Sequence, residues 1–481
     1  MSLVLAVAEK GQVDTSLSEK KHSEYLELEN NCRSVLLTKL FQAHQARYDD
    51  SSSMDILKPS IFTSRKPRKL DRTSYLNGLR GLACLFVVFH HGTEQFYPWI
   101  RAGFLSTPTA TNLLSLPIVR IWLSGHAMVD IFFVISGYVL SAKPLRLARE
   151  GQHVEAYKTI ASSTLRRGVR LYLPCLVHTL VVVCFMRVGW LGDRGLQKWN
   201  PAPSLIEELQ KWLRASLVFF NPFSLGHDYE SHLWTMPHEF QGSMVVYLSC
   251  LALARSTNIF RSLTLFILAA YWMYMTHWYY FLFTAGMVCA DLHMILEPSI
   301  NLDIDPEQPA KRSLLKRIFH GVAVFACLWL LSFPRFNEGA DQSLGYASLV
   351  PWIPPSWRGE VYQSMWWLVI TAPVFIAVLD SAGHESVYQK FLCSGFIQYL
   401  GDISFALYLC HGMWINSLGL EMVHSICGRW GFQMVEGDVG FVGVLILTSL
   451  VVMPLTFWHS EVFTRTVDKA TLRLSARLTK L

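Results

Sequence analysis

The sequence predicts an all-α, polytopic membrane protein with about ten transmembrane helices. Of its 481 residues, 52% are hydrophobic and only 16% are charged, whereas about a quarter of the residues in ordinary soluble domains are charged. Mean hydropathy is +0.29. A soluble protein of this length would need several domains, each covered by a charged shell, and the chain has too few charges to supply them. The same figures exclude fibrous, disordered and disulfide-scaffold proteins.

The chain begins with a polar tail, residues 1–73, which has room for one short helix around Tyr25 to Tyr48. Its first apolar run is too short for a signal peptide and has no basic flank, so the first membrane span must serve as the insertion signal. Runs long enough to cross a bilayer at about 20 residues each follow the tail. They lie near 77–97, 117–141, 169–190, 238–254, 259–275, 277–293, 317–333, 363–381, 395–416 and 439–459.

Lysine and arginine residues between the runs indicate the orientation. If the tail is cytosolic, the basic loops at Lys143 to Arg170, Arg255 to Arg261 and Lys311 to Arg317 fall on the cytosolic side, together with Arg465 to Lys480. Cytosolic loops carry the excess of positive charge. We therefore expect both termini in the cytosol, with a membrane domain over 74–460 and a C-terminal tail over 461–481. Ten spans fit this arrangement, and eight or twelve fit nearly as well.

The residue pattern argues against a nucleic-acid partner and against a bound metal ion. The basic cluster Arg65 to Arg72 flanks an apolar run, as topology-setting residues do, so we expect no nucleic-acid partner. The ten cysteines lie mostly within apolar stretches and form no CxxC pair, which indicates small buried side chains. The histidines lack the spacing of a zinc site, because His238-Glu239 is not followed by a second histidine at HExxH spacing. No metal is expected.

Ionisable residues inside spans are costly and mark candidate functional sites. The first span carries Arg80 near its cytosolic end and His91 deeper in. Eleven steps at about 100° per residue bring the two side chains to within about 20° of each other, about 16 Å apart along the axis. One face of this helix is thus expected to present a fixed cation and a titratable base.

Further embedded polar residues follow the first span. Asp130 lies in an aliphatic run, where we expect it to orient a histidine or to pair with an arginine. Ser136-Gly137-Tyr138 interrupts the same run. The stretch from Arg166 to Pro174 opens the next span with Arg167 and Arg170, whose guanidinium groups suit the phosphates of a nucleotide-bearing cofactor.

Taken in order, these segments resemble the acyltransferase 3 family of integral membrane acyltransferases over about residues 74–459. Arg80 and His91 match the family's R-x10-H motif, and Asp130 to Tyr138 is similar to its second-helix signature. The form Trp234-Thr-Met-Pro-His238-Glu239 resembles the W-[ST]-x-x-x-E segment of fungal members, with His238 as a departure from the usual aliphatic residue. Later segments that resemble the family are Phe281 to Gly286 and Leu400 to His411, the second of which includes Tyr408.

The resemblance implies transfer of an acyl group, commonly acetyl from acetyl-CoA, onto a hydroxyl, with His91 as the catalytic residue and Arg80 as its essential partner. An imidazole can take a proton near neutral pH, and Arg80, Arg167 and Arg170 would hold acyl-CoA. Ser136 and Tyr138 are candidate donors to the thioester oxygen. Five further residues are expected to bind substrate or to be structural: Asp130, Trp234, Glu239, Tyr408 and His411. For Glu239, contact with the acceptor and locking of the first helix both remain open.

The acceptor is expected to be a small lipophilic alcohol, such as a fungal terpenoid or polyketide secondary metabolite. A sterol or a cell-surface glycan is the alternative acceptor, and a secondary transporter is the alternative class of protein, although the paired broken helices of two related halves are not evident. A non-catalytic scaffold or receptor would leave Arg80 and His91 unexplained. We expect the protein in the endoplasmic reticulum or another endomembrane, in contact with membrane lipid.

Overall fold

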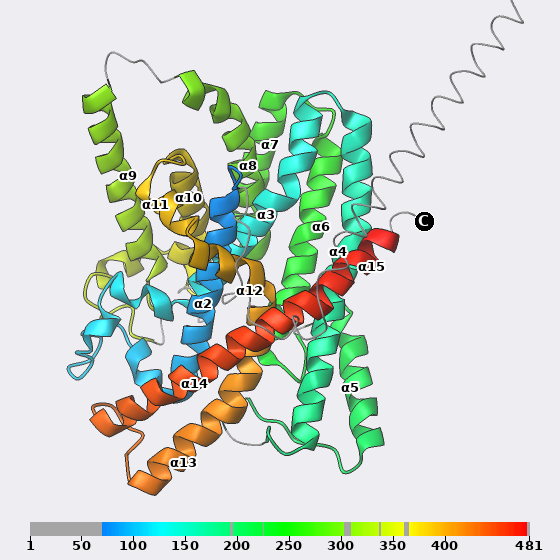
Figure 1. Cartoon of the computed structure of the whole chain (residues 1–481). Helices are drawn as coiled ribbons and strands as arrows, with labels where there is room; N and C mark the ends of the chain where they lie inside the picture. Colours follow the sequence, from blue (N-terminus) through cyan, green and yellow to red (C-terminus); the bar gives the residue numbers. More distant parts are fainter. Residues whose placement is uncertain are drawn as a thin grey trace, which may run out of the picture. The chain divides into compact units, whose positions relative to one another are not determined.

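The computed structural model describes residues 70–192, 195, 197–224, 226–302, 309–335, 338–359 and 365–478. The described chain is a bundle of helices (Figure 1), and its β pairing is limited to an isolated bridge between His227 and Glu230. The all-α class is therefore confirmed for these residues. The expected tail over 1–73, with its short helix, lies outside the described residues as far as residue 69. The longer helices are α2 (Ser74–Phe96), α3 (Gly125–Arg149), α4 (His153–Arg187), α5 (Leu205–Phe219), α6 (Thr235–Leu253), α7 (Asn258–Tyr274), α8 (Trp278–Leu302), α9 (Pro309–Leu331), α10 (Met365–Ser381), α12 (Gly395–Trp414), α13 (Leu420–Trp430), α14 (Val439–Phe463) and α15 (Lys469–Leu478).

Each predicted apolar run contains a helix, but the predicted count of about ten spans is not confirmed. Among the described residues, six helices are long and apolar enough to cross a membrane, and α10 is a shorter apolar helix. The count falls because α7 and α10 have only 17 residues each, and because polar residues interrupt α2 and the first turns of α6. The six are Gly125–Arg149, His153–Arg187, Trp278–Leu296, Leu314–Leu331, Gly395–Trp430 and Val439–Leu478.

Two span boundaries differ from the prediction for physical reasons. The run expected at 117–141 becomes helical only at Gly125, because the short 3-10 helices η4 (Leu113–Ser115) and η5 (Val119–Leu123) precede it. The run expected at 169–190 belongs to the 35-residue helix α4, so Arg167 and Arg170 lie within a helix rather than at its start. Arginine and alanine favour helix strongly enough to extend α4 through this basic stretch.

Helix α5 was missed by the sequence analysis. Ser204 caps its N-terminus, since the Ser204 side chain accepts a hydrogen bond from the Glu207 backbone N–H, and Glu207 and Glu208 lie in the first turn. Its charged residues keep its hydropathy below that of a span. The helix packs on α4 in the loop region that precedes α6.

The segment expected to be a C-terminal tail, 461–481, is part of the bundle as far as Leu478. Helix α14 continues through the π-helical turn η11 (Thr464–Asp468) into α15, and α15 packs against α4. Thr471 and Ser475 are buried at this contact. Figure 1 shows α14 and α15 as one long helix that runs obliquely across the other helices. Residues of this segment can therefore line the interior of the helix bundle.

Helices α2 and α12 cross with their backbones in near contact, which positions the first candidate residue. A Cβ on Gly81 would lie 2.3 Å from the Gly401 nitrogen, and a Cβ on Gly401 would lie 2.3 Å from the Asn77 carbonyl oxygen. Only glycine permits this approach. It lets the Arg80 guanidinium reach the Gly401 carbonyl oxygen at 2.9 Å.

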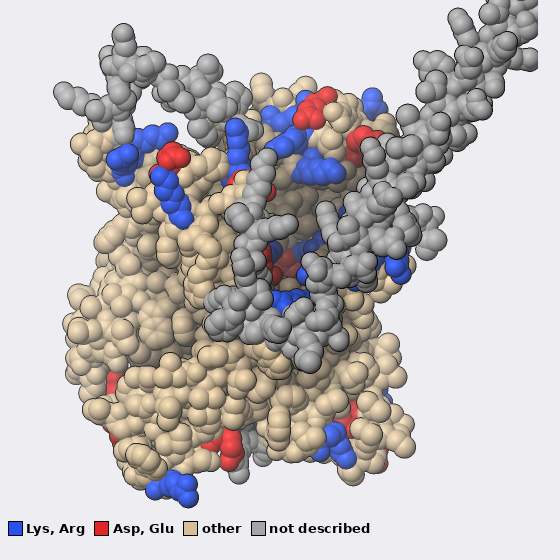
Figure 2. Space-filling view, viewed as in Figure 1, with Lys and Arg blue, Asp and Glu red and all other residues tan. Residues whose placement is uncertain are grey.

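Charged side chains are unevenly placed on the surface. On the face shown in Figure 2, most lysines and arginines lie at the end of the bundle where α3 ends and where α4 and α9 begin. Acidic and basic groups also show inside a hollow lower on the same face, whereas the surrounding surface is mostly uncharged.

Candidate active site

A cavity of about 250 Å³ inside the bundle brings together many of the residues that the sequence analysis singled out. Its walls come from α2, α3, α4, α6, α12 and η11. Its lining combines charged and polar residues with apolar ones, which suits a ligand with a charged end and an extended arm. The predicted residues in its lining are Arg80, Ser136, Arg167, Arg170, Glu239 and Tyr408; the others are Val129, Phe132, Phe133, Leu171, Thr235, Met236, Asp402, Ser404, Phe405 and Asp468.

Arg80 is held at the cavity by the contact between α2 and α12. Its Nη2 donates to the Asn77 side-chain oxygen and to the Gly401 carbonyl oxygen, each at 2.9 Å. Its Nε is buried and has no hydrogen-bond partner among the described residues. The guanidinium is thus positioned by the fold while part of its donor capacity is unused.

Glu239 is fixed between α3 and α4. Its Oε1 accepts a hydrogen bond from Arg167 Nη2 at 2.6 Å and another from the Ser136 hydroxyl at 2.5 Å. Arg167 Nε also donates to the Ser243 hydroxyl at 2.7 Å. Glu239 Oε2 is buried without a hydrogen-bond partner in the described chain. Of the two roles left open for Glu239, locking of the first helix receives no support, because these partners lie in α3 and α4.

Arg170 differs from the other two cavity arginines. Among the described residues it forms no hydrogen bond or ion pair, although it lines the same cavity as Arg80 and Arg167. The three guanidinium groups share the cavity with three carboxylates, those of Glu239, Asp402 and Asp468. The lining is therefore formally neutral, and Arg170, whose nearest opposite charge in the cavity is Asp468, can engage a ligand without breaking a hydrogen bond to the protein.

Tyr408 is the lining residue of the cavity that lies against a group of histidines. The Tyr408 hydroxyl donates to the His232 carbonyl oxygen at 2.5 Å and lies 2.7 Å from the Thr235 hydroxyl. The Tyr408 ring centroid is 5.3 Å from that of His232 and 6.0 Å from that of His411. The cavity thus leads toward imidazole groups.

His91 does not line the cavity and lies beyond Tyr408 in this histidine group. The His91 ring stacks on His411 with centroids 5.2 Å apart and lies 6.4 Å from His232; the rings of His232 and His411 are 4.7 Å apart. The Nε2 atoms of His232 and His411 are buried without hydrogen-bond partners in the described chain. The structure therefore places both His91 and the predicted His411 beside His232, which the sequence analysis assigned no role.

A buried carboxylate, that of Glu230, contacts the histidine group through His232. Glu230 is 1% exposed and lies between His178 Nε2 and His232 Nδ1, at 3.3 Å from each. Burial alone would raise the pKa of Glu230, but the neighbouring His232 and His178 lower it to about 2. Glu230 is thus ionised at neutral pH and fixes the ring orientation of His232.

Three predicted residues are brought neither to the cavity nor to the histidine group. The ring of Tyr138 faces His293, at a centroid distance of 6.2 Å. Trp234 lies in η6 (Ser231–Trp234), 6.3 Å from the ring of Trp278. Asp130 has neither the histidine nor the arginine partner expected for it: its side chain is fully buried, and neither carboxylate oxygen has a hydrogen-bond partner among the described residues, because α3 packs here within the apolar core.

Sequence reasoning missed several residues of the site, although signals were present. Asp402 belongs to the Leu400 to His411 segment, and His232 lies two residues before Trp234. Asp468 was assigned to a tail, so its position on η11 was not anticipated. In the described part of the chain, no group of three or more histidine, cysteine, aspartate or glutamate side chains could hold a metal ion.

Comparison with known proteins gives three relatives and one family. Residues 73–460 match the family Acyl_transf_3, described as an acyltransferase domain. The O-acetyltransferase PaAT-1 of Phomopsis amygdali is 31% identical over 455 residues, which cover 88% of each chain. The acyltransferase clz18 of Cochliobolus lunatus is 23% identical, covering 78% of this chain and 90% of the relative, and the acyltransferase R4 of a Phoma species is 23% identical, covering 80% and 93%. No solved structure matches the chain.

Proposed function

This chain belongs to the acyltransferase 3 family, and from that premise we propose that it transfers an acyl group, acetyl in the first instance, from acyl-CoA to a hydroxyl of a small lipophilic molecule. Membership supports an integral membrane acyltransferase over the alternative of a secondary transporter. A relative named as an O-acetyltransferase supports acetyl as the group transferred. The acceptor we favour is a fungal secondary metabolite such as a terpenoid or polyketide alcohol.

The proposal depends most on one observation, that Tyr408 joins the arginine-lined cavity to the histidine group. Tyr408 lines the same cavity as Arg80, Arg167 and Arg170, and its ring lies next to His411, which stacks on His91. Guanidinium groups bind phosphates through charge-assisted hydrogen bonds. The phosphates of CoA would occupy the arginine end, and the pantetheine arm would bring the thioester toward Tyr408 and Thr235.

In the proposed reaction, His91 acts as the general base. Its imidazole takes the proton of the acceptor hydroxyl while that oxygen attacks the thioester carbonyl. Collapse of the tetrahedral intermediate breaks the carbon–sulfur bond, and the departing thiolate takes the proton from the imidazolium. The products are the ester and free CoA thiol, and no other reactant is needed. Of the two predicted donors to the developing oxyanion, Ser136 lines the cavity and Tyr138 does not; the Ser136 hydroxyl would have to turn from Glu239 Oε1, to which it donates, in order to serve.

A second cavity, of about 270 Å³, supports a lipophilic acceptor. It lies beside the turn of α2 that carries His91, between that helix, the π-helical turn η10 (Ile415–Gly419) and α14. Most of its lining is apolar, and the Thr448 hydroxyl in its wall is buried without a hydrogen-bond partner among the described residues. The space suits an apolar body with one polar substituent.

Replacing Gly92 by leucine should raise the KM for the acceptor by about tenfold, as expected when a side chain blocks an apolar pocket. Gly92 lines the second cavity, and a Cβ on it would meet no atom within 4 Å, so a leucine can be accommodated only by filling the space. The KM for acyl-CoA should stay within about twofold. Steady-state kinetics with each substrate varied in turn measures both constants.

Gly443 provides the matched control for this substitution. It is also a helical glycine with no atom within 4 Å of a built Cβ, but it is exposed on α14 and lines neither cavity described above. Gly443→Leu should leave both KM values unchanged. Equal effects of the two substitutions on acceptor KM would remove the second cavity from the proposal.

The proposed activity is tested with purified protein in lipid vesicles, acetyl-CoA labelled in the acetyl group, and a panel of terpenoid and polyketide alcohols. We expect labelled ester and free CoA thiol in equal amounts. Sterols and glycans in the same panel test the alternative acceptors. If no acyl-CoA is consumed with any alcohol, the donor assignment is wrong. Comparing the acylated metabolites of cells with and without the protein identifies the natural acceptor.

The orientation is also part of the proposal. The basic loops that flank the spans favour a cytosolic location for both termini and for the arginine-lined cavity, from which cytosolic acyl-CoA would bind. The endoplasmic reticulum or another endomembrane is the proposed location. Cysteine labelling at exposed loop positions in sealed vesicles tests the orientation, because only cytosolic positions react with an impermeant reagent before lysis.

A further inference from the structure

Helix α2 presents a carboxylate to His91 that the proposed mechanism has not yet used. Glu94 lies one turn beyond His91, and its Oε2 is 3.4 Å from His91 Nδ1. The two side chains are 30% and 33% exposed, so this pair by itself would be loosely held in water. Whether Glu94 can orient His91 therefore depends on what holds Glu94.

The second oxygen of Glu94 is fixed by an arginine on the following loop. Glu94 Oε1 accepts from Arg101 Nη1 at 2.7 Å, and Arg101 lies at the end of η3 (Pro98–Arg101), just after α2. Arg101 is only 11% exposed. One oxygen is thus held by a buried guanidinium while the other faces the imidazole, which restricts the rotation of the carboxylate.

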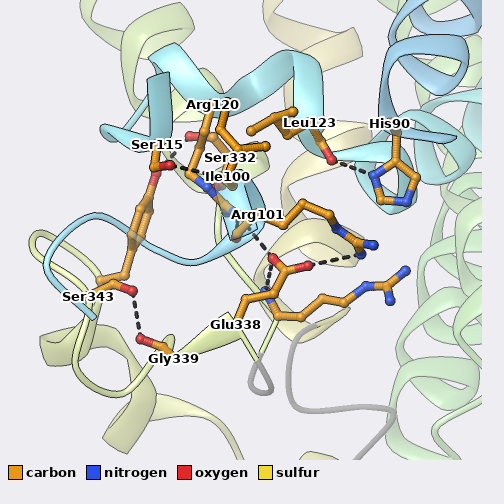
Figure 3. A network of polar contacts seen from close by, with 12 residues as sticks. His90, Ile100, Arg101, Ser115, Arg120, Leu123, Ser332, Glu338, Gly339 and Ser343 are labelled. Atoms are coloured by element: carbon orange, nitrogen blue, oxygen red, sulfur yellow. Dashed lines mark hydrogen bonds and ion pairs between the residues drawn. The ribbon is translucent and has the colours of Figure 1, made fainter. Parts of the chain in front are cut away.

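Arg101 is held in turn by a buried network of alternating charge (Figure 3). Its Nη2 donates to Glu338 Oε1 at 3.0 Å, and Glu338 Oε2 accepts from Arg120 Nη2 at 2.9 Å. Arg120 is 2% exposed and also donates to the carbonyl oxygens of Ser332 and Arg101, at 2.8 and 2.7 Å. Burial would raise the pKa of Glu338, but Arg120 and Arg101 hold it below its usual range, so Glu338 remains ionised.

Backbone hydrogen bonds lock the two loops that carry this network. The Gly103 N–H donates to the Glu338 carbonyl oxygen at 2.8 Å, and the Leu344 N–H donates to the Phe104 carbonyl oxygen at 2.9 Å. The Arg101–Glu338–Arg120 network is therefore a rigid support beneath Glu94. Such rigidity is what a residue needs in order to hold a catalytic group in one geometry.

The other titratable groups around His91 do not compete for this role. His90, on the same helix, has its Nδ1 on the Leu123 carbonyl oxygen at 2.6 Å. His411 of α12 and His232 of η6 contribute imidazoles, and Glu230 behind them is 3.3 Å from His232. Glu94 is thus the carboxylate that faces His91 Nδ1 in the described chain.

We propose that Glu94, fixed by Arg101, Glu338 and Arg120, is a positioning residue that keeps the proton of neutral His91 on Nδ1 and leaves Nε2 free to take the proton of the acceptor hydroxyl. This inference rests on the proposed role of His91 as general base. The carboxylate also stabilises the imidazolium that forms during the reaction. Arg101 and Glu338 act only through Glu94 and do not touch the substrate.

The test is Glu94→Gln in the full-length protein in vesicles. The amide keeps the size of the side chain but loses the charge, so kcat should fall by about 10²-fold, at the low end of general-base contributions. The KM for acyl-CoA should stay within about twofold, because Glu94 does not line the arginine cavity.

Three further variants make the outcome unambiguous. Glu207→Gln, at an exposed glutamate of α5, should leave kcat and the KM for acyl-CoA unchanged. Glu94→Asp should recover part of the lost kcat, because it restores the charge at a shorter reach. Glu338→Gln should reproduce a weaker form of the Glu94→Gln effect. If Glu94→Gln keeps full kcat while His91→Ala is inactive, the inference fails and the proposed function stands. If His91→Ala is fully active, the base assignment itself fails.

Discussion

Replacing His91 by alanine is expected to lower kcat by about 10²- to 10⁴-fold, the usual contribution of a general base. The KM for acyl-CoA should change by less than about twofold, because His91 lies beyond Tyr408 and does not line the arginine cavity. The expected pattern is therefore a loss of turnover with the donor still bound. Ester formation and binding of a non-hydrolysable acyl-CoA analogue, measured on the same preparation, separate the two quantities.

The matched control is His424→Ala, at an exposed histidine of α13. It removes an imidazole from a membrane-associated helix without touching the histidine group, and it should leave kcat unchanged. Full turnover by His91→Ala would contradict the mechanism. In that case His411 or His232, whose rings are 4.7 Å apart, would be the next base to examine.

The sequence analysis predicted the α2 part of the site because helical periodicity is a local property. Arg80 and His91 do lie on one helix, Ser74–Phe96, as the R-x10-H spacing indicated. The same local logic could have found Glu94, which follows His91 at i, i+3. It was overlooked because it lies near the end of the expected span, where a charged residue looks like a flank.

The rest of the site depends on contacts between distant segments, which periodicity does not reveal. His232 and His411 meet His91 only because α2 packs on α12 and because Tyr408 bonds to the loop before α6.

Asp130 is the opposite case, a residue for which the sequence indicated a contact that the structure does not show. An embedded carboxylate indicated a partner, but no local feature reveals which face of α3 turns toward the apolar core. The count of about ten spans is not confirmed for a related reason, since the polar residues that build the site lower the hydropathy of α2 and α6.

The second prediction with a large effect separates two arginines that the sequence treats alike. Arg167→Gln should destabilise the protein by about 3–5 kcal/mol, because it removes one partner of a largely buried ion pair and leaves the Glu239 carboxylate uncompensated. Arg167 and Glu239 are 13% and 14% exposed, and their atoms are 2.6 Å apart. Arg170→Gln should leave stability nearly unchanged, because Arg170 has no hydrogen-bond or ion-pair partner among the described residues. Thermal unfolding in detergent measures the difference.

For the binding of acyl-CoA, the two substitutions should rank the other way: Arg170→Gln should have the larger effect and Arg167→Gln the smaller. Arg170 is free to engage the phosphates of acyl-CoA, and one charge-assisted hydrogen bond contributes about 1.5–3 kcal/mol. Arg170→Gln should therefore raise the KM for acyl-CoA by about 10- to 100-fold. The double variant Arg167→Gln with Glu239→Gln is the compensating control, since it removes both charges together and should recover much of the stability lost in Arg167→Gln alone.

These two measurements decide how the cavity is used. The cavity lining carries as many carboxylates as guanidinium groups, so net charge alone cannot draw an anionic cofactor into it. Binding must then depend on which cation lacks a protein partner. If Arg170→Gln leaves the KM for acyl-CoA unchanged while the double variant raises it, the phosphates bind at the Arg167–Glu239 pair by displacing the carboxylate. If Arg170→Gln raises it and the double variant does not, the ion pair is structural and Arg170 selects the donor.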